Sequence, residues 1–259
     1  MSYREADRSR VRTVPIQNRS NKVDPSLLAV PPGEERSVGA FLSSLPDVLA
    51  ARDLLTVIGR VRAAAAAKRG VVMMLGGHVI KVGLGPLVRT LMERGVVTHV
   101  AMNGAGAIHD FELAAFGGTS EDVESGLGDG TFGMAEETGR EMNAAIGAAA
   151  RAGKGLGEGL IDALSARTDL PGRDVSILVA AGKLGIPVSV HAALGAEIIH
   201  QHPAADGAAI GATSMRDFDR LAGSLPALDG GGVVLNWGSA VIMPEVFLKA
   251  LTVARNLGG

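Results

Sequence analysis

The sequence predicts an α/β fold in which a doubly wound, mostly parallel sheet carries helices on both faces. Short apolar segments alternate along the 259 residues with segments of helical periodicity. Glycine-rich turns join them, and residues 71–75 form an unbroken apolar run of the kind found in strands buried on both faces. Ligands of such sheets bind outside the carboxyl ends of the strands.

We expect the chain to consist of two parts. Residues 1–36 are polar, contain four prolines and show no sustained period, which is typical of an extended arm. Residues 37–259 are expected to form a single domain, because one large core is the default for a chain of this length.

The elements of that domain are expected in a regular order. A long helix begins near Ser37 and ends at Gly70, with apolar residues three and four apart. The later elements are strand 71–75, helix 86–94, strand 96–101, a glycine- and acid-rich stretch at 117–139, an alanine-rich helix that ends near 152, helix 174–184, strand 186–190, helix 214–222, strand 232–236 and helix 244–256.

The composition excludes several classes of protein. The chain has no cysteine, which removes disulfides, thiolate metal ligands and cysteine nucleophiles and fits a reducing compartment. A net charge of −2 and an aromatic content of 3% argue against a nucleic-acid partner. No apolar run approaches the ~18 residues of a membrane span, and no apolar segment follows the charged N-terminus as in a signal peptide. We therefore expect a soluble cytoplasmic protein without a nucleic-acid or membrane partner.

The first candidate site follows strand 71–75. Gly76, Gly77 and His78 lead through further glycines to the next helix, and glycines at such a turn let the backbone approach a cofactor closely. The spacing departs from G-x-G-x-x-G, so a turn whose glycines serve only packing is the competing interpretation.

The second candidate is a small-residue loop, expected at 103–110 after the next strand. Such a loop lets a flat ligand lie against the backbone. Its candidate cofactor contacts are Asn103, Gly104, Ala105, Gly106 and Asp110. Asp110 is equally well explained as a helix cap.

The third candidate is a cluster of histidines. His191, His200 and His202 lie within twelve residues, with Glu197 and Asp206 nearby. Three imidazoles and a carboxylate could hold zinc or iron, although side chains at i and i+2 point apart on a helix. The alternatives are a catalytic or substrate-contacting histidine and a purely structural one.

Two further segments lie at predicted strand ends. Asn236, Gly238 and Ser239 surround the single Trp237 after the last strand and are candidate cofactor contacts. The stretch 117–139 is either a solvated surface or a functional lid or cation-binding loop. Its acidic residues are Glu121, Asp122, Glu124, Asp129, Glu136 and Glu137.

The order of these motifs resembles the deoxyhypusine synthase family, which includes homospermidine synthases. The resemblance runs from about residue 37 to residue 256 and rests on the strand that ends at Leu75 and Gly76, the loop 103–110, the strand 186–188 and the final glycine-rich strand and helix. It implies a Rossmann-like, NAD-binding domain over 37–259 and a homotetramer with active sites at dimer interfaces. In the implied NAD loop the matching residues are Gly104, Ala105, Gly106 and Asp110.

The family chemistry is not fully matched by this sequence. In the family NAD takes hydride from an amine, an enzyme lysine captures the aminobutyl group, and an acceptor amine receives it. The lysine would fall near Val241 or Ile242, and neither can form an imine. The acidic residues that hold the polyamine would fall around Gly195 and His200, and His109 replaces a glutamate of the NAD loop.

We therefore expect an NAD-binding enzyme, an oxidoreductase or transferase, that dehydrogenates a small polar amine or hydroxyl substrate without a covalent lysine. His200 is the expected proton shuttle because imidazole titrates near neutral pH, with Glu197 or Asp206 as its orienting carboxylate and His191 as a further catalytic candidate. The alternatives are a metal-dependent hydrolase or lyase that uses His191, His200 and His202, and a non-catalytic nucleotide-binding subunit of a larger assembly.

Overall fold

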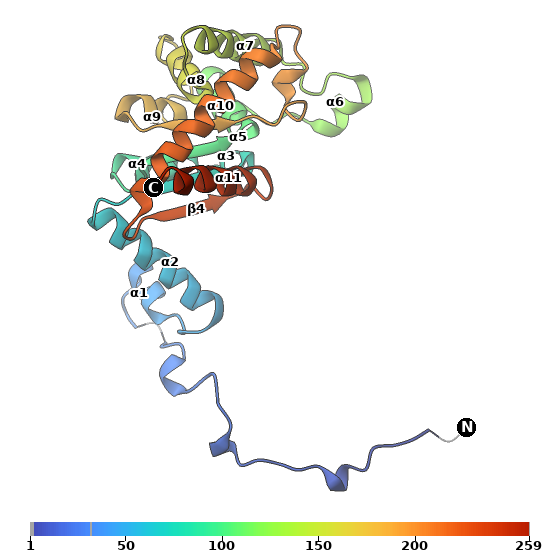
Figure 1. Ribbon diagram of the computed structural model, residues 1–259, viewed down its shortest axis with the longest axis vertical. Helices are drawn as coiled ribbons and strands as arrows, with labels where there is room; N and C mark the ends of the chain where they lie inside the picture. The colour runs from blue at the N-terminus through green and yellow to red at the C-terminus, as the bar shows by residue number, and fades with distance from the viewer. Residues whose placement is uncertain (1–2, 32, 259) are drawn as a thin grey trace. The chain divides into compact units, whose positions relative to one another are not determined.

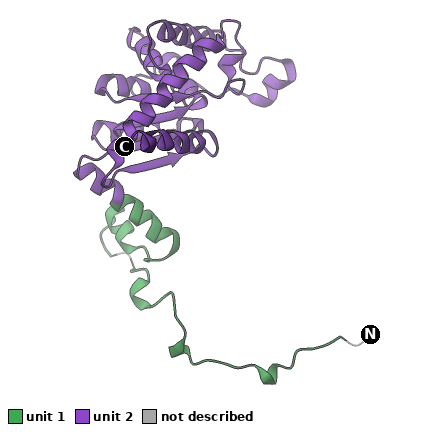
Figure 2. Cartoon of the chain, viewed as in Figure 1, with its two compact units in different colours: residues 1–59 green, residues 60–259 purple. Residues whose placement is uncertain are grey.

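The computed structural model describes residues 3–31 and 33–258 of the chain (Figure 1). The chain divides into two compact units, residues 1–59 and residues 60–259 (Figure 2). The boundary therefore falls inside the helical segment expected from residue 37. No helix in the described ranges is long and apolar enough to cross a bilayer.

The first unit contains little regular structure, and none of its described residues is buried. The single helix expected from Ser37 to Gly70 is wrong, because the structure has two helices there. Leu45 is extended (ψ 148°) because Pro46 disfavours the helical conformation of the residue before it. The elements of this part are η1 (Arg8–Arg10), η2 (Ile16–Asn18), η3 (Pro25–Leu27), α1 (Val38–Ser44) and α2 (Leu49–Ala66), whose last residues belong to the second unit.

Four parallel strands form the sheet of the second unit, in the order β3-β2-β1-β4. The strands are β1 (Val71–Leu75), β2 (His99–Asn103), β3 (Val188–His191) and β4 (Val233–Trp237). The prediction of one parallel sheet is confirmed. Both β2 and β3 begin later than the apolar pattern indicates.

Helices make up most of the rest of the second unit. The elements between β1 and β3 are α3 (Gly77–Lys81), α4 (Gly85–Glu93), α5 (Gly104–Phe116), α6 (Val123–Asp129), α7 (Glu136–Arg151), α8 (Leu156–Ser165) and α9 (Ile177–Leu184). Those after β3 are η4 (Ile198–His200), α10 (Gly207–Ser224), η5 (Leu225–Leu228) and α11 (Ile242–Asn256). The glycine-rich segments that form α6 and α8 carried no helix prediction.

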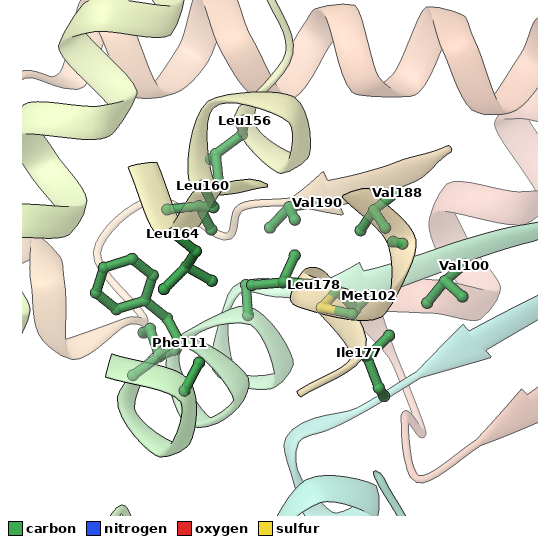
Figure 3. Packing of buried hydrophobic residues seen from close by; sticks show 14 of the residues in the cluster. Val100, Met102, Phe111, Leu156, Leu160, Leu164, Ile177, Leu178, Val188 and Val190 are labelled. Carbon is green, nitrogen blue, oxygen red and sulfur yellow. The ribbon is translucent and has the colours of Figure 1, made fainter. Parts of the chain in front are cut away.

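The sheet has a core on each face, because successive side chains of a strand point to opposite faces. Met73 and Leu75 belong to the larger core cluster, together with residues of α3, α4, α5, α7, α8 and α9 and of the first turn of α10. Val72 and Met74 belong to the smaller cluster, with residues of α10 and α11. Figure 3 shows part of the larger cluster, in which Val190 lies among side chains of the surrounding helices. Helices on both faces are thus confirmed.

The strand order reverses at β1, which β2 and β4 flank. Doubly wound sheets place ligands at such a point, outside the carboxyl ends of the strands. We call residues 76–78 and 236–239 the β1/β4 edge. Two glycines touch there: a Cβ on Gly76 would lie 1.9 Å from the carbonyl oxygen of Gly238. Packing alone therefore requires the glycine at 76.

The loop expected at 103–110 is wrong, because α5 begins at Gly104. The side chain of Asn103 explains this start, since its Oδ1 accepts a hydrogen bond from the Gly106 N–H at 2.9 Å and caps the helix. Glycine has a low helix propensity, and the glycines at 104 and 106 therefore suggested a loop.

Candidate functional site

The second unit contains a cavity of about 690 Å³ beside the residues that follow β2 and β3. This volume is in the range of small-molecule sites. Residues of α3, α5 and α7 line it, together with the segments 116–123 and 196–198. The larger apolar residues of its wall are Ile108, Phe116, Val123, Phe132 and Ile198.

The charged residues of this wall are mainly acidic. Glu112, Glu121, Glu137 and Glu197 line the cavity, and Lys81 is the only lysine or arginine that does so in the described ranges. This charge distribution favours a cationic ligand over an anionic one. Glu121 and Glu137 belong to the acidic stretch 117–139 and line the cavity. A cation-binding segment, one of the alternatives for this stretch, would require such a position.

Glu197 is the most deeply buried of these carboxyl groups, with 8% of the residue exposed. Its Oε1 accepts a hydrogen bond from the Ala193 N–H at 2.9 Å. Burial raises the pKa of Glu197 to about 7. The backbone N–H groups of Ala193 and Gly104 lower this pKa, because they stabilise the carboxylate, but burial has the larger effect. A carboxyl group with a pKa near neutrality can both accept and return a proton.

His200 lies behind Glu197 and, in the described chain, is absent from the cavity wall. Its Nε2 is 3.4 Å from Glu197 Oε2, without the alignment of a hydrogen bond. Its Nδ1 accepts the Gly195 N–H at 3.1 Å, so the proton of the neutral ring resides on Nε2 and faces the carboxyl group. Burial lowers the pKa of His200. Of the two residues, Glu197 thus lines the cavity and His200 lies next to it, and the catalytic roles expected of both stay predictions.

The other residues of the histidine cluster are not brought to the cavity. His191 is buried and contacts Ser189 Oγ at 3.0 Å, and His202 Nε2 contacts Glu136 Oε2 at 3.2 Å. Asp206 caps α10, where its Oδ1 accepts hydrogen bonds from the Ala208 and Ala209 N–H groups. Within residues 3–31 and 33–258 no three His, Asp or Glu side chains are placed to hold a metal ion. The ligand set of the metal-dependent alternative is thus not assembled.

Asp110 caps a helix, which was one of the two interpretations of this residue. The helix is α9, which is distant in sequence, and not the helix that contains Asp110. Its carboxyl group is 1% exposed and accepts hydrogen bonds from Ser176 Oγ, the Ile177 N–H and the Leu178 N–H at 2.7 to 2.9 Å. These donors begin α9. Both oxygens of Asp110 are occupied and buried, so the cap accounts for this residue, and its contact with a cofactor stays a prediction.

Packing also accounts for the small residues at the start of α5. A Cβ on Gly104 would lie 2.0 Å from the Glu197 carboxyl group, and one on Gly106 would lie 3.3 Å from Met102 Cβ. Neither glycine is open for a ligand to approach. Ala105, by contrast, lines the cavity.

The β1/β4 edge is partly open. His78 is exposed, Gly77 is half-buried and Trp237 is 38% exposed. Asn236 and Ser239 instead shape the turn: Asn236 Nδ2 donates to the Ser239 carbonyl at 2.9 Å, and Ser239 Oγ accepts the Met243 N–H at 3.1 Å. Of the candidate cofactor residues after β4, Asn236 and Gly238 are thus exposed and Ser239 is buried.

Four polar residues of the wall were missed by the sequence analysis as candidate site residues. His109 Nδ1 contacts Thr119 Oγ1 at 2.7 Å, Thr119 Oγ1 donates to Glu112 Oε2, and Thr138 Oγ1 donates to Glu112 Oε1 at 2.9 Å. The spacing of His109 and Glu112 at i and i+3 would have indicated a shared helix face, had residues 104–116 been assigned to a helix.

No family model and no curated protein matches the sequence. Several solved structures are similar in fold at low identity. ArgZ, an arginine dihydrolase from the ornithine-ammonia cycle in cyanobacteria, has 15% identity and a TM-score of 0.46 over 77% of this chain and 26% of its own. AgrE in a ternary complex with ornithine and NAD+ has 15% identity and a TM-score of 0.43 over 83% of this chain and 35% of its own. A LOR/SDH protein from Methanococcus maripaludis S2 has 12% identity and a TM-score of 0.43 over 94% of this chain and 68% of its own. The chain therefore spans about a quarter to a third of the length of ArgZ and AgrE.

Proposed function

We propose that this protein is an NAD-dependent oxidoreductase or transferase that acts on a small cationic amine bound in the cavity. One observation carries the proposal. Glu197, whose pKa is raised to about 7, reaches a cavity whose wall carries three further carboxyl groups and a single lysine. The hydroxyl substrate that the sequence left open explains this excess of acidic groups less well.

The wall is suited to an amine with an apolar stem. Carboxylates bind ammonium groups by charge-assisted hydrogen bonds. Ile108, Phe116 and Phe132 offer apolar surface to methylene groups between two such ends. The proposed substrate class is therefore a short linear diamine or a related amine.

Glu197 is the proposed proton acceptor for the substrate. An alkylammonium must lose a proton before its carbon can give up hydride. In this step the N–H bond breaks, the electron pair stays on the amine nitrogen, and the proton bonds to the Glu197 carboxylate. The backbone N–H groups of Ala193 and Gly104 stabilise the carboxylate before it takes the proton, and His200 Nε2 lies 3.4 Å from its Oε2.

The proposed place for NAD is the β1/β4 edge. Its exposed side chains are those of His78 and Trp237, and Trp237 offers an aromatic surface to a flat polar ligand. Gly77, His78 and Trp237 would hold the cofactor, which supplies a hydride acceptor when bound. Lys81 and Ala105, from α3 and α5, line the neighbouring cavity. The homotetramer implied by the family resemblance remains part of the proposal, and light scattering of the purified protein measures it.

The test compares a four-carbon linear diamine with the diol of the same length in the presence of NAD. We expect the diamine to bind and NADH to form, and the diol to do neither. Glu197→Gln should lower kcat by roughly 10² to 10⁴ with little change in NAD affinity, the usual contribution of a positioned base. Glu245→Gln is the matched control, since Glu245 is exposed on α11 and pairs with Lys249 outside the cavity. Equal binding of diamine and diol, or full activity of Glu197→Gln, would contradict the proposal.

A further inference from the structure

We infer that His109 is a second proton acceptor of the cavity, held by Thr119 and Glu112 so that its Nε2 lone pair is free for a bound molecule. The hydrogen-bond relay behind this inference stands on the structure alone. The chemical step assigned to it rests on the proposed function.

The relay fixes which nitrogen of His109 carries the proton. A threonine hydroxyl has a single hydrogen, and Thr119 donates it to Glu112 Oε2. Thr119 Oγ1 can therefore only accept from His109 Nδ1, which lies 2.7 Å away. The neutral ring must then be protonated on Nδ1, which leaves the lone pair on Nε2.

Glu112 is itself held in place. Thr138 of α7 donates to its other oxygen at 2.9 Å and is 3% exposed, so a hydroxyl group occupies each carboxylate oxygen. The carboxylate of α5 is thereby anchored to a second helix, and with it the orientation of Thr119. Such an arrangement orients an imidazole and stabilises the imidazolium that forms when the ring takes a proton.

The ring is open on its other side. His109 lines the cavity, and Nε2 has no hydrogen-bond partner among the described residues. A Cβ on Gly77 would lie 3.0 Å from His109 Cδ2, so glycine at that position leaves room for the ring.

The surroundings keep the ring neutral. Burial lowers the pKa of His109, and electrostatic repulsion by Lys81 and His78 on α3 lowers it further. The other titratable groups of the cavity are Glu112 on the same helix, Glu121 in the following segment, Glu137 on α7 and Glu197 after β3. A neutral imidazole with a free lone pair is the form that accepts protons.

A second acceptor suits a reaction with two proton transfers. Once Glu197 has taken the proton of the amine and the hydride has left, the substrate carries a C=N bond, and His109 would deprotonate the water or acceptor amine that attacks its carbon. The O–H or N–H bond of the attacking group breaks as its new bond to carbon forms, the proton bonds to Nε2, and the π electrons of the C=N bond move to its nitrogen. Glu197 then returns its proton to the substrate nitrogen, and the C–N bond breaks so that its electron pair leaves on ammonia. In hydrolysis the proton of the added hydroxyl passes to the Glu197 carboxylate and a C=O bond remains. In transfer a C=N bond to the acceptor remains, and the hydride removed earlier returns to that carbon.

The relay is tested by nitrogen NMR of the histidine rings in the full chain, at a pH where His109 is neutral. We expect the Nδ1–H tautomer in the wild type and in Thr119→Ser, and a loss of this preference in Thr119→Val. Thr131→Val is the matched control, because Thr131 makes the same kind of bond to exposed Asp129, at 2.6 Å, outside the cavity. An Nε2–H tautomer in the wild type would overturn the relay.

The chemical role is tested by pH profiles of turnover with the linear diamine and NAD. His109→Gln should lower kcat by roughly 10² to 10⁴ and change KM by no more than a few-fold. Thr119→Val removes the hydroxyl that accepts from His109 Nδ1 and stabilises the imidazolium, so the acidic limb of the kcat profile should move to lower pH. Thr119→Ser keeps the hydroxyl and should show the wild-type profile. If the wild type turns over the diamine and the pH profiles of kcat are unchanged in His109→Gln and Thr119→Val, the inference is overturned. An Nδ1–H tautomer without turnover of any amine would support the relay and contradict the proposed function instead.

Discussion

The carboxyl group of Glu197 lies against the backbone of Gly104, where a Cβ would come within 2.0 Å of Glu197 Cδ and Oε2. The first residue of α5 thereby makes room for the proposed base. As long as the Glu197 carboxyl group holds this position, residue 104 can have no side chain. Helix start and site chemistry are coupled at this contact.

The coupling predicts that the effect of Gly104→Ala on stability depends on residue 197. In the wild type it should lower the free energy of unfolding by about 1 to 3 kcal/mol, since the added methyl group must displace a buried carboxyl group. In Glu197→Ala the same substitution should be neutral or stabilise by up to about 1 kcal/mol, because alanine favours helix over glycine. Urea unfolding of the four proteins measures the coupling. Equal costs in the two backgrounds would contradict the contact.

The raised pKa of Glu197 predicts a pH dependence of stability. In the unfolded chain the group titrates near its ordinary value of 4.5, and in the fold near 7. Between these values the unfolded state loses a proton that the native state keeps, so stability falls as pH rises from about 4.5 to 7 and is level above that. The full difference is about 3 kcal/mol at most. The wild type should therefore lose stability relative to Glu197→Gln over this window, as urea unfolding at several pH values would show. A constant difference would exclude the shift.

The buried cap of α9 predicts a large effect at Asp110. Asp110→Ala leaves one hydroxyl and two backbone N–H groups without their acceptor, each at about 1 to 3 kcal/mol, so we expect a loss of at least about 3 kcal/mol. Asp110→Asn, which keeps one acceptor oxygen, should lose less. Asp206→Ala is the control, since this exposed cap of α10 should contribute only about 1 kcal/mol. The folded Asp110→Asn protein should bind NAD as the wild type does, and weaker binding would restore a cofactor role for Asp110.

The contact between Gly76 and Gly238 predicts that alanine at 76 is poorly tolerated. The added Cβ meets a backbone carbonyl at 1.9 Å, which cannot move as a side chain can, so the cost should reach or exceed the upper end of about 1 to 3 kcal/mol. Gly211→Ala on α10 meets nothing within 4 Å and should stabilise by about 0.5 to 1 kcal/mol. Thermal unfolding of both variants checks the pair. An unchanged melting temperature for Gly76→Ala would show that the glycine does not serve packing.

The sequence by itself determined the fold class. Unbroken apolar runs such as 71–75, short and followed by glycines, indicate strands with both faces covered, and their alternation with helical segments predicts parallel strands. It also placed Glu197 and His200 next to each other near a strand end. These features are local, because periodicity and strand ends can be recognised within a few residues.

Only the tertiary structure decided the roles of the individual side chains. Asp110 caps a helix that begins at Ile177, and Thr138 reaches Glu112 from another helix. Burial then set the pKa of Glu197 and left His200 behind it. Hydrogen-bond partners distant in sequence, and the exclusion of water around a group, depend on how the helices pack on the sheet, and no local pattern contains that information.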